Sequence, residues 1–389
     1  MSILFLAHRV PYPPDRGDKI RSYHVLRHLA RRAPVHLYAF ADDPADEIPH
    51  PVLRDLTASC TIVPRRKGRA RATLEALASG RPVSLTAFDS AAMRAALAAA
   101  PCCDATYCFS GQMAQYLPAD RPAVMDFVDV DSAKFGQLAE TAALPLRPLL
   151  RREARLLGRF ERDVAARVAA SLFVTDAEAA LFRAGGGRGR IAVVENGIDA
   201  RFFDPAATFE RLPAGPLIVM TGQMDYRPNV DAAIWFADAV LPRLRLRHPE
   251  ACFAIVGRNP APALQALARR PGVRVTGAVP DVRPWLAAAT VCVAPLKLAR
   301  GVQNKVLEAM AMARPVIASP AAAEGIDHGG TVEVADGVDA WVERVGAVLA
   351  APRKNLAGRA QVLNRYAWAV RLAPLDALLG LGQRSREAA

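Results

Sequence analysis

The chain has 389 residues, 52% of them hydrophobic, and this length favours two domains of ordinary size over one unusually large domain. Its formal net charge is +12, but only six of its fifty basic residues are Lys, so an Arg-rich composition gives little reason to expect a nucleic-acid partner. The apolar run from Ser2 to Ala7 is too short for a signal peptide, and no run of about eighteen apolar residues is free of charge. We therefore expect a soluble protein.

The cysteines indicate a reducing compartment. None of the six forms a C-x-x-C pair, and Cys252 and Cys292 lie inside apolar runs typical of strands. The sequence also contains no H-E-x-x-H motif and no cluster of His, Asp and Glu at metal-ligand spacing. We expect a cytoplasmic protein with free thiols, no metal site and no cofactor.

Strand-like and helical runs alternate along the whole chain, which predicts parallel sheets covered by helices. The first series of expected strands is Ile3–Ala7, Val35–Phe40, Cys60–Val63, Ala105–Phe109, Ala123–Val128, Ser171–Val174 and Ile191–Glu195. The second series is Leu217–Thr221, Cys252–Val256, Val273–Val275, Val291–Ala294, Val316–Ala318 and Val332–Val334. The fold class predicted is therefore α/β, with two Rossmann-like doubly wound domains that face each other across a cleft.

We place an N-terminal domain at residues 1–200 and a C-terminal domain at residues 201–365. Residues 366–389 are expected to form a helix that crosses back to the first domain. An amphipathic run from Asn229 to Leu244 predicts one helix. The Gly-rich segment 185–189 follows a helix and precedes a strand, which is the wrong order for a phosphate loop, so we interpret it as a connector. In such folds ligands lie beyond the carboxyl ends of the strands.

The segment from Pro295 to Val316 carries the strongest chemical pattern. A strand ends at Pro295, a polar loop follows, and a helix begins near Gln303, so free backbone N–H groups with Arg300 and Lys305 beside them suit a diphosphate. Glu308 lies about one turn further along the same face and could bind ribose hydroxyls. The alternative is that Lys305 and Glu308 form a solvated surface pair on a helix whose apolar residues face the core.

This segment, with 195–199 and 202–205, resembles the retaining GT-B-fold glycosyltransferases of the family 4-like, group 1 type. The resemblance extends through 221–229, 255–258, 275–282 and 366–368. The N-terminal segments 13–22 and 124–132 are similar to the sugar transferases associated with bacterial exosortase/PEP-CTERM exopolysaccharide systems. The resemblance implies that residues 1–200 form the acceptor-side domain and that residues 201–365 form the nucleotide-sugar-binding domain. It also implies that Glu308 binds the donor ribose. It also places Arg300 where relatives carry a glutamate that contacts the transferred sugar.

The resemblance further places Gln223 and Pro228 where relatives carry a basic pair, so Arg227 and Arg258 are the nearest substitutes for neutralising leaving-group charge. The expected donor-binding residues are Gly222, Arg258, Val279, Arg300, Gly301, Gln303, Asn304 and Glu308. The expected catalytic residues are Arg227, Lys305 and Asp129.

In the N-terminal half, Gly17, Asp18 and Arg21 open a helix after the first strand and are candidates for contact with the donor phosphates or the acceptor. The alternative is simple helix capping by Asp15 or Asp18. Asp126, Asp129 and Asp131 come at the end of the fifth strand, and these carboxylates either contact a sugar or cap the next helix. None of the seven histidines stands out as catalytic, and His8, at the end of the first strand, is the nearest candidate among them.

Two basic stretches, 65–71 and 147–159, remain. The second alternates Leu and Arg at helical spacing, which suits either an anionic lipid surface or a solvated helix packed by its Leu face. The resulting hypothesis is a cytoplasmic hexosyltransferase, peripheral at the inner face of the membrane. It would move sugar from a nucleotide diphosphate to a polyprenyl-linked or growing glycan with retention.

Two other functions were weighed against this hypothesis. A nucleotide-sugar epimerase or hydrolase of the same fold would yield an epimerised donor, or free nucleotide without a glycosylated product. A nucleic-acid-binding protein would need strong salt-dependent binding, and the sequence contains no recognised nucleic-acid-binding module. We therefore expect no nucleic-acid partner.

Overall fold

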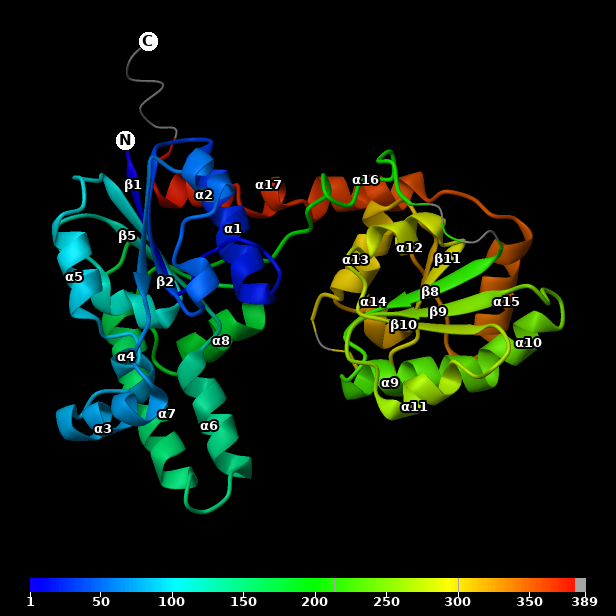
Figure 1. Cartoon of the computed structure of the whole chain (residues 1–389), viewed down its shortest axis with the longest axis horizontal. Helices are drawn as coiled ribbons and strands as arrows, with labels where there is room; N and C mark the ends of the chain where they lie inside the picture. Colours follow the sequence, from blue (N-terminus) through cyan, green and yellow to red (C-terminus); the bar gives the residue numbers. More distant parts are fainter. Residues whose placement is uncertain (211, 213–214, 300, 382–389) are drawn as a thin grey trace, which may run out of the picture. The chain divides into compact units, whose positions relative to one another are not determined.

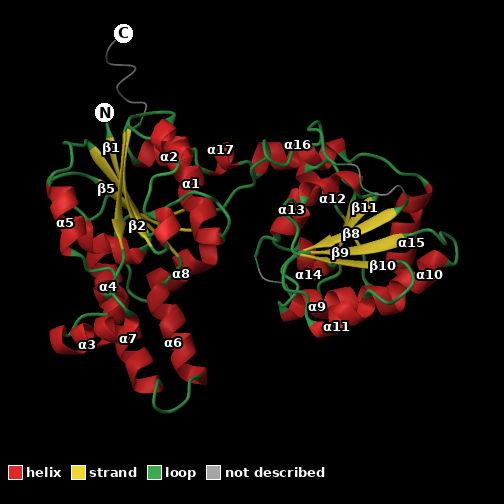
Figure 2. Ribbon diagram, in the orientation of Figure 1, coloured by secondary structure: helices red, strands yellow, loops and turns green. Residues whose placement is uncertain are grey.

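The computed structural model describes residues 1–210, 212, 215–299 and 301–381 and is shown in Figure 1. These residues form two compact units. One comprises Met1–Asn196 and the C-terminal segment that begins at Arg371, and the other comprises Gly197–Val370. Each unit has its own parallel sheet and its own helical layers (Figure 2).

The first unit contains a seven-stranded sheet in the order β3-β2-β1-β4-β5-β6-β7, and its paired strands are all parallel. Every side chain of β1 and β4 is buried, as expected for strands covered on both faces. The strands are β1 (Ile3–Ala7), β2 (Val35–Ala41), β3 (Ser59–Pro64), β4 (Ala105–Phe109), β5 (Ala123–Val128), β6 (Ala170–Phe173) and β7 (Ile191–Val193).

Helices connect these strands, and α6 and α7 form a hairpin that extends away from the sheet (Figure 1). The helices are α1 (Gly17–Ala30), α2 (Pro51–Leu56), α3 (Arg69–Ser79), α4 (Val83–Thr86), α5 (Ala91–Ala98), α6 (Asp131–Thr141), α7 (Arg147–Ala165), α8 (Asp176–Ala184) and α18 (Pro374–Leu378), with 3-10 turns η1 (Pro44–Asp46) and η2 (Gly111–Tyr116). Asp376 of α18 accepts hydrogen bonds from His28 Nε2 (2.9 Å) and pairs with Arg32 Nε (2.6 Å). These contacts attach the C-terminal segment to α1.

The second unit contains a six-stranded parallel sheet in the order β10-β9-β8-β11-β12-β13. The strands are β8 (Leu217–Thr221), β9 (Cys252–Val256), β10 (Val273–Gly277), β11 (Val291–Ala294), β12 (Val316–Ala318) and β13 (Glu333–Val334). The helices are α9 (Arg227–Trp235), η3 (Phe236–Val240), α10 (Leu241–Arg245), α11 (Pro262–Leu267), α12 (Arg283–Ala288), α13 (Asn304–Ala311), α14 (Pro320–Ala323), α15 (Gly337–Ala350) and α16 (Leu356–Arg365). The last residue of α17 (Trp368–Arg371) is the first residue of the C-terminal segment that belongs to the first unit.

The helix expected from Asn229 to Leu244 is one continuous helical segment in three parts. The middle part, η3, is a π-helical turn rather than an α-helix. A π-helical turn changes which side chains face the sheet, and here the buried residues include Phe236 and Val240.

The expected α/β fold class, with two doubly wound parallel sheets, is confirmed. In each sheet the strand order reverses beside a central strand, between β1 and β4 in the first unit and between β8 and β11 in the second. The loops that leave these strand ends diverge to opposite faces, and ligands bind at such points in open parallel sheets. The switch points therefore direct attention to the loops after β1, β4, β8 and β11.

Candidate active site

In the second unit, the ends of β8 and β9 approach each other closely. The Gly222 amide donates to the Val256 carbonyl at 3.1 Å. A Cβ atom built on Gly257 would lie 1.7 Å from the Gly222 carbonyl oxygen. Because no side chain fits at Gly257, this glycine allows the loop after β8 to lie directly against the end of β9.

Asn229 joins this loop to α13. Its side chain is 5% exposed; Oδ1 accepts a hydrogen bond from Lys305 Nζ at 2.5 Å, and Nδ2 donates to the Gln223 carbonyl at 2.9 Å. A Cβ atom on Gly222 would lie 2.9 Å from Asn229 Nδ2 and 3.2 Å from Lys305 Nζ. The Lys305 ammonium is thus held against the backbone of the loop after β8.

Glu308 lies one turn beyond Lys305 on α13 and is half-buried. Among the residues that the structure describes, no side chain or backbone group donates a hydrogen bond to its carboxylate. Burial raises the pKa of Glu308 to about 7, and the nearby Lys305 opposes the shift. Burial lowers the pKa of Lys305 to about 8, and Glu308 opposes that shift. Desolvated ionisable groups of this kind are common at functional sites.

The start of α13 lies beside the same cluster. Gln303 is the residue before the helix, and its Nε2 donates to the Gly301 carbonyl at 3.2 Å, while Asn304 is exposed at the first helical position. Gly301 has φ of +64°, which favours glycine, and a Cβ on Gly325 would lie 2.6 Å from the Gly301 carbonyl oxygen. Arg300 lies outside the described residues.

The other expected donor residues are spread around the cluster. Arg258 follows β9, and its Nη2 lies 3.5 Å from Gln223 Oε1. Val279 is half-buried in the loop after β10. The Arg227 side chain is 85% exposed and pairs with Asp231 on its own helix at 2.8 Å, so the structure does not place it in contact with Lys305. Its catalytic role stays a prediction.

The first unit contains a buried charge cluster at the end of β5. Arg21, 1% exposed, donates through Nε to Asp126 Oδ2 at 2.8 Å and through Nη1 to Asn196 Oδ1 at 3.0 Å. Tyr107 OH donates to the same Asp126 oxygen. The placement of Arg21 in the core favours a positioning role, and a direct contact with phosphate stays a prediction.

Two strained residues lie at the ends of β4 and β5. Ser110 has φ of +77° and Val128 has φ of +71°, a conformation that a β-branched residue rarely adopts. The Asp126 carboxylate supports Val128 by accepting its backbone N–H at 3.2 Å. Such strain at strand ends is common at functional sites. It marks the loop that carries Asp129.

Asp129 is half-buried and accepts a hydrogen bond from Lys134 Nζ at 2.6 Å. Lys134 is also 3.5 Å from Asp131, whose pKa is raised by burial. Asp131 is the first residue of α6, but the residue at the N-cap is Val130 and no side chain caps this helix through a hydrogen bond. Asp129 stays a candidate for contact with a sugar.

Asp18, at the start of α1, is surrounded by basic groups. Its carboxylate is 3.3 Å from His8 Nε2 and 2.5 Å from Arg9 Nη1, and the hydrogen bond from His8 is the largest cause of its lowered pKa. Gly17 is the first residue of α1, and a Cβ on it would contact nothing within 4 Å. The structure therefore groups His8, Arg9 and Asp18 at the end of β1.

Comparison with known proteins identifies the class. Residues 215–351 match the family model described as glycosyl transferases group 1. Over 261 residues the chain is 30% identical to the GDP-mannose-dependent alpha-(1-6)-phosphatidylinositol monomannoside mannosyltransferase of Mycolicibacterium smegmatis. The aligned region covers 54% of this chain and 67% of that protein.

Solved structures show the same fold. HepE of Anabaena, crystallised with UDP, aligns with a TM-score of 0.62 at 14% identity over 98% of this chain and 100% of that one. A glycosyltransferase from Rickettsia africae aligns with a TM-score of 0.59 at 12% identity over 98% of each chain. The two α/β units thus have the GT-B fold of glycosyltransferases. The chain belongs to the group 1 glycosyl transferases.

Proposed function

We propose that this glycosyltransferase moves a hexosyl residue from a nucleotide diphosphate donor to a glycan or polyprenyl-linked acceptor, with retention of configuration. The observation that supports it best is the cluster in the second unit. Lys305 is held by Asn229 against Gly222, and the Glu308 carboxylate lies one turn away without a described partner. A cation and a carboxylate at one switch point suit a diphosphate joined to a ribose.

Each group has a distinct chemical task in this proposal. The Lys305 ammonium and the backbone N–H groups at the start of α13 contact the diphosphate and stabilise the charge that develops on it as the glycosidic bond breaks. The ribose hydroxyls donate hydrogen bonds to the Glu308 carboxylate. With Arg258 beside the loop after β8, these cations supply the charge stabilisation, and we propose that the reaction needs no divalent metal.

Two relatives support the choice of a donor class. The mycobacterial relative is named as dependent on GDP-mannose, and HepE was also crystallised with UDP-glucose. Both donors are hexoses on a nucleoside diphosphate. We propose a donor of this class, and retention of configuration follows the group 1 resemblance.

The first unit is proposed to bind the acceptor. Its strained loop after β5 presents Asp129 beside Lys134, with Ser110 at the end of β4. A carboxylate held in this way can accept a hydrogen bond from an acceptor hydroxyl. The proposed acceptor side is therefore the strand-end loops of the first sheet.

A lipid-linked acceptor is consistent with two surfaces of the first unit. On α3, Leu74 and Leu77 are 69% and 54% exposed, and basic residues precede them. Near the turn of the α6–α7 hairpin, Leu138, Leu144 and Leu146 are at least half exposed, and α7 is rich in Arg. Exposed Leu beside Arg suits the surface of an anionic membrane. Among the described residues, no helix is long and apolar enough to cross a bilayer.

A transfer assay tests the proposal. Purified protein is incubated with GDP-mannose, UDP-glucose and other labelled nucleotide sugars, and with polyprenyl-linked acceptors in anionic vesicles, with and without EDTA. We expect a glycolipid product with the anomeric configuration of the donor, an unchanged rate in EDTA, and strong loss of turnover in Lys305→Ala. Lys354→Ala, which changes an exposed lysine, is the matched control. Absence of turnover with every donor would contradict the proposal.

A further inference from the structure

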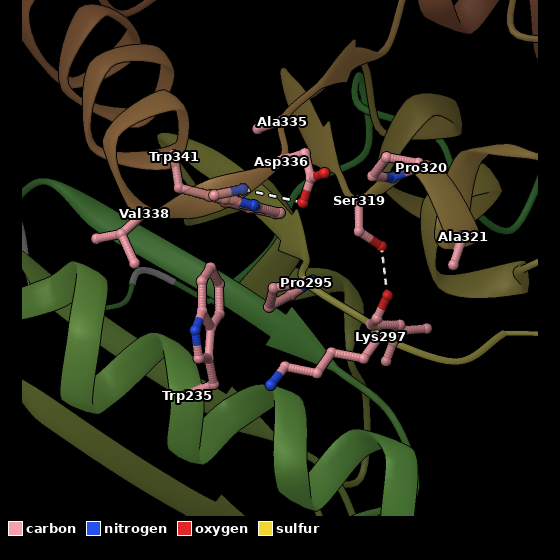
Figure 3. Close-up of a pocket in the computed structure, with 12 residues that line it drawn as sticks. Trp235, Pro295, Lys297, Ser319, Pro320, Ala321, Ala335, Asp336, Val338 and Trp341 are labelled. Carbon is pink, nitrogen blue, oxygen red and sulfur yellow. Dashed lines mark hydrogen bonds between the residues drawn. The ribbon is translucent and has the colours of Figure 1, made fainter.

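The second unit contains a pocket that is separate from the Lys305 cluster. It measures about 470 Å³, and it lies at the carboxyl ends of β11, β12 and β13 and against α9 and α15 (Figure 3). None of Gly222, Asn229, Lys305 and Glu308 lines it. Its volume is in the range of pockets that hold small organic ligands.

Two tryptophans form one side of this pocket. Trp235 of α9 and Trp341 of α15 meet edge to face, with ring centroids 6.0 Å apart. Trp341 is only 2% exposed, whereas Trp235 is half-buried, and Figure 3 shows its ring standing along the pocket beside Pro295 and Val338. Trp235 therefore offers a flat apolar ring face together with an indole N–H donor.

Polar groups of both signs line the pocket. Lys297 is exposed, its ammonium contacts no carboxylate among the described residues, and its side chain extends toward Trp235 in Figure 3. Asp336 is exposed, and Oδ1 accepts the Gly337 N–H at 3.0 Å, which leaves lone pairs on the carboxylate for a ligand. The pocket thus carries one cation and one anion next to an aromatic wall.

Hydrogen bonds of Ser319 hold together two of the loops that line the pocket. Ser319 Oγ donates to the Leu296 carbonyl at 2.5 Å and accepts the Ala322 N–H at 3.2 Å, so the loop after β11 is tied to the start of α14. A preformed pocket loses less conformational entropy when a ligand binds.

We propose that this pocket binds a neutral saccharide. A pyranose has an apolar C–H face that can stack on the Trp235 ring, and it has hydroxyls that can donate to Asp336 and accept from Lys297. A polyanion would be opposed by Asp336, and a cation by Lys297. The site would hold a glycan segment on the second unit, and it does not depend on the proposed donor site.

Intrinsic fluorescence gives a direct test because Trp235 is the one partly exposed tryptophan of the four. Trp285, Trp341 and Trp368 are 7%, 2% and 5% exposed. The full-length protein is titrated with neutral trisaccharides of glucose, mannose and N-acetylglucosamine, up to about 10 mM, because single-pocket affinities of this kind are weak. We expect a saturable change in emission with at least one of them.

Four variants assign that change. Trp235→Phe keeps a stacking ring, so calorimetry should still detect trisaccharide binding although the emission change is lost. Trp235→Ala should bind the trisaccharide about tenfold more weakly. Lys297→Met and Asp336→Asn should each weaken binding several-fold, and Asn retains the helix cap. Leu298→Ala, an exposed residue of the same loop that does not line the pocket, is the control. Thermal unfolding verifies that each variant is folded.

Three results would overturn the saccharide site: no emission change and no heat with any trisaccharide, equal affinity in Trp235→Ala and wild type, or tighter binding of a nucleoside diphosphate than of every trisaccharide in this pocket. Donor turnover, measured in the same preparations, reports separately on the proposed transferase activity.

Discussion

Lys305 and Glu308 are ionisable groups that burial pushes toward their neutral forms. The pKa of Lys305 falls to about 8 and that of Glu308 rises to about 7, in each case because burial disfavours the charge. Neither group has a carboxylate or cation in direct contact among the described residues. In the proposed donor complex, the phosphates would pair with Lys305 and the ribose hydroxyls would pair with Glu308.

The pH dependence of kcat/KM follows from these two pKa values. Below about pH 7 Glu308 gains a proton, and its carboxyl group can no longer accept hydrogen bonds through both oxygens as a carboxylate does. Above about pH 8 the Lys305 ammonium loses its proton and its charge. We expect a narrow bell with limbs near these values, and a weaker alkaline limb in Lys305→Arg. Initial rates at low donor concentration test it. A level profile across both limbs would contradict the assignment.

The ionised Glu308 carboxylate should lower the free energy of unfolding above neutral pH. The folded protein holds the Glu308 proton up to about pH 7, whereas an unfolded chain releases it near the ordinary glutamate pKa of 4.5. Stability from this group is therefore lost as pH rises between those values. Glu308→Gln should therefore raise the free energy of unfolding at pH 8 by about 1–3 kcal/mol, and by less at pH 5.

Urea unfolding at both pH values measures this effect, with the exposed Glu343→Gln as the control. The same Gln variant should bind a nucleotide sugar more weakly. An equal gain in stability at pH 5 and pH 8 would show that the carboxylate charge is not the cause.

At the scale of elements, the site depends on how closely the loop after β8 approaches the end of β9. Gly257 permits this approach, because any Cβ there would overlap the Gly222 carbonyl oxygen. The loop in turn positions the Gln223 carbonyl that holds Asn229, and Asn229 holds Lys305. A substitution at Gly257 that moves this loop should therefore also displace the Lys305 ammonium, through the Gln223–Asn229 and Asn229–Lys305 hydrogen bonds.

Gly257→Ala should destabilise the protein by about 2–4 kcal/mol, because backbone must move to admit the methyl group. It should also weaken donor binding. Gly136→Ala, in the middle of α6 with nothing within 4 Å of the new Cβ, should instead add about 0.5–1 kcal/mol of stability. Thermal unfolding and donor titration of both variants provide the comparison. Donor affinity as in wild type for Gly257→Ala would contradict the proposed route.

The strands could be predicted closely because buried parallel strands appear as apolar runs bounded by turn residues. The π-helical turn at Phe236–Val240 could not, since its residues fit the same apolar pattern as an α-helix. The left-handed backbone conformation of Val128 could not be predicted from the sequence either, because a β-branched residue normally indicates an ordinary strand conformation.

At the scale of the whole molecule, the site was predicted only in part. The helix start near Gln303 and the pair Lys305 and Glu308 follow from local spacing, and the structure places them together. Asn229 was not predicted as a site residue, because its partner Lys305 is 76 positions away in the chain. An Asn just inside a helix start usually indicates capping, so only the fold reveals this contact.

In the proposed function the two units have different tasks. The second contains the Lys305 cluster, while the first contains the Arg21–Asp126 pair that supports the strained loop carrying Asp129. Removing one partner of a buried ion pair leaves an uncompensated charge. The Arg21–Asp126 pair therefore supports the backbone of the loop that carries Asp129, and a direct contact of Arg21 with phosphate stays a prediction.

The most direct test of the central claim is calorimetric binding of GDP and UDP, and of their hexose conjugates, to the wild type, Lys305→Ala, Glu308→Ala and the exposed-lysine control Lys354→Ala. We predict that at least one nucleotide binds the wild type and the control equally. It should bind Lys305→Ala and Glu308→Ala at least about tenfold more weakly, because each loses a charged contact. Equal affinity in all four proteins would contradict the donor site described on α13.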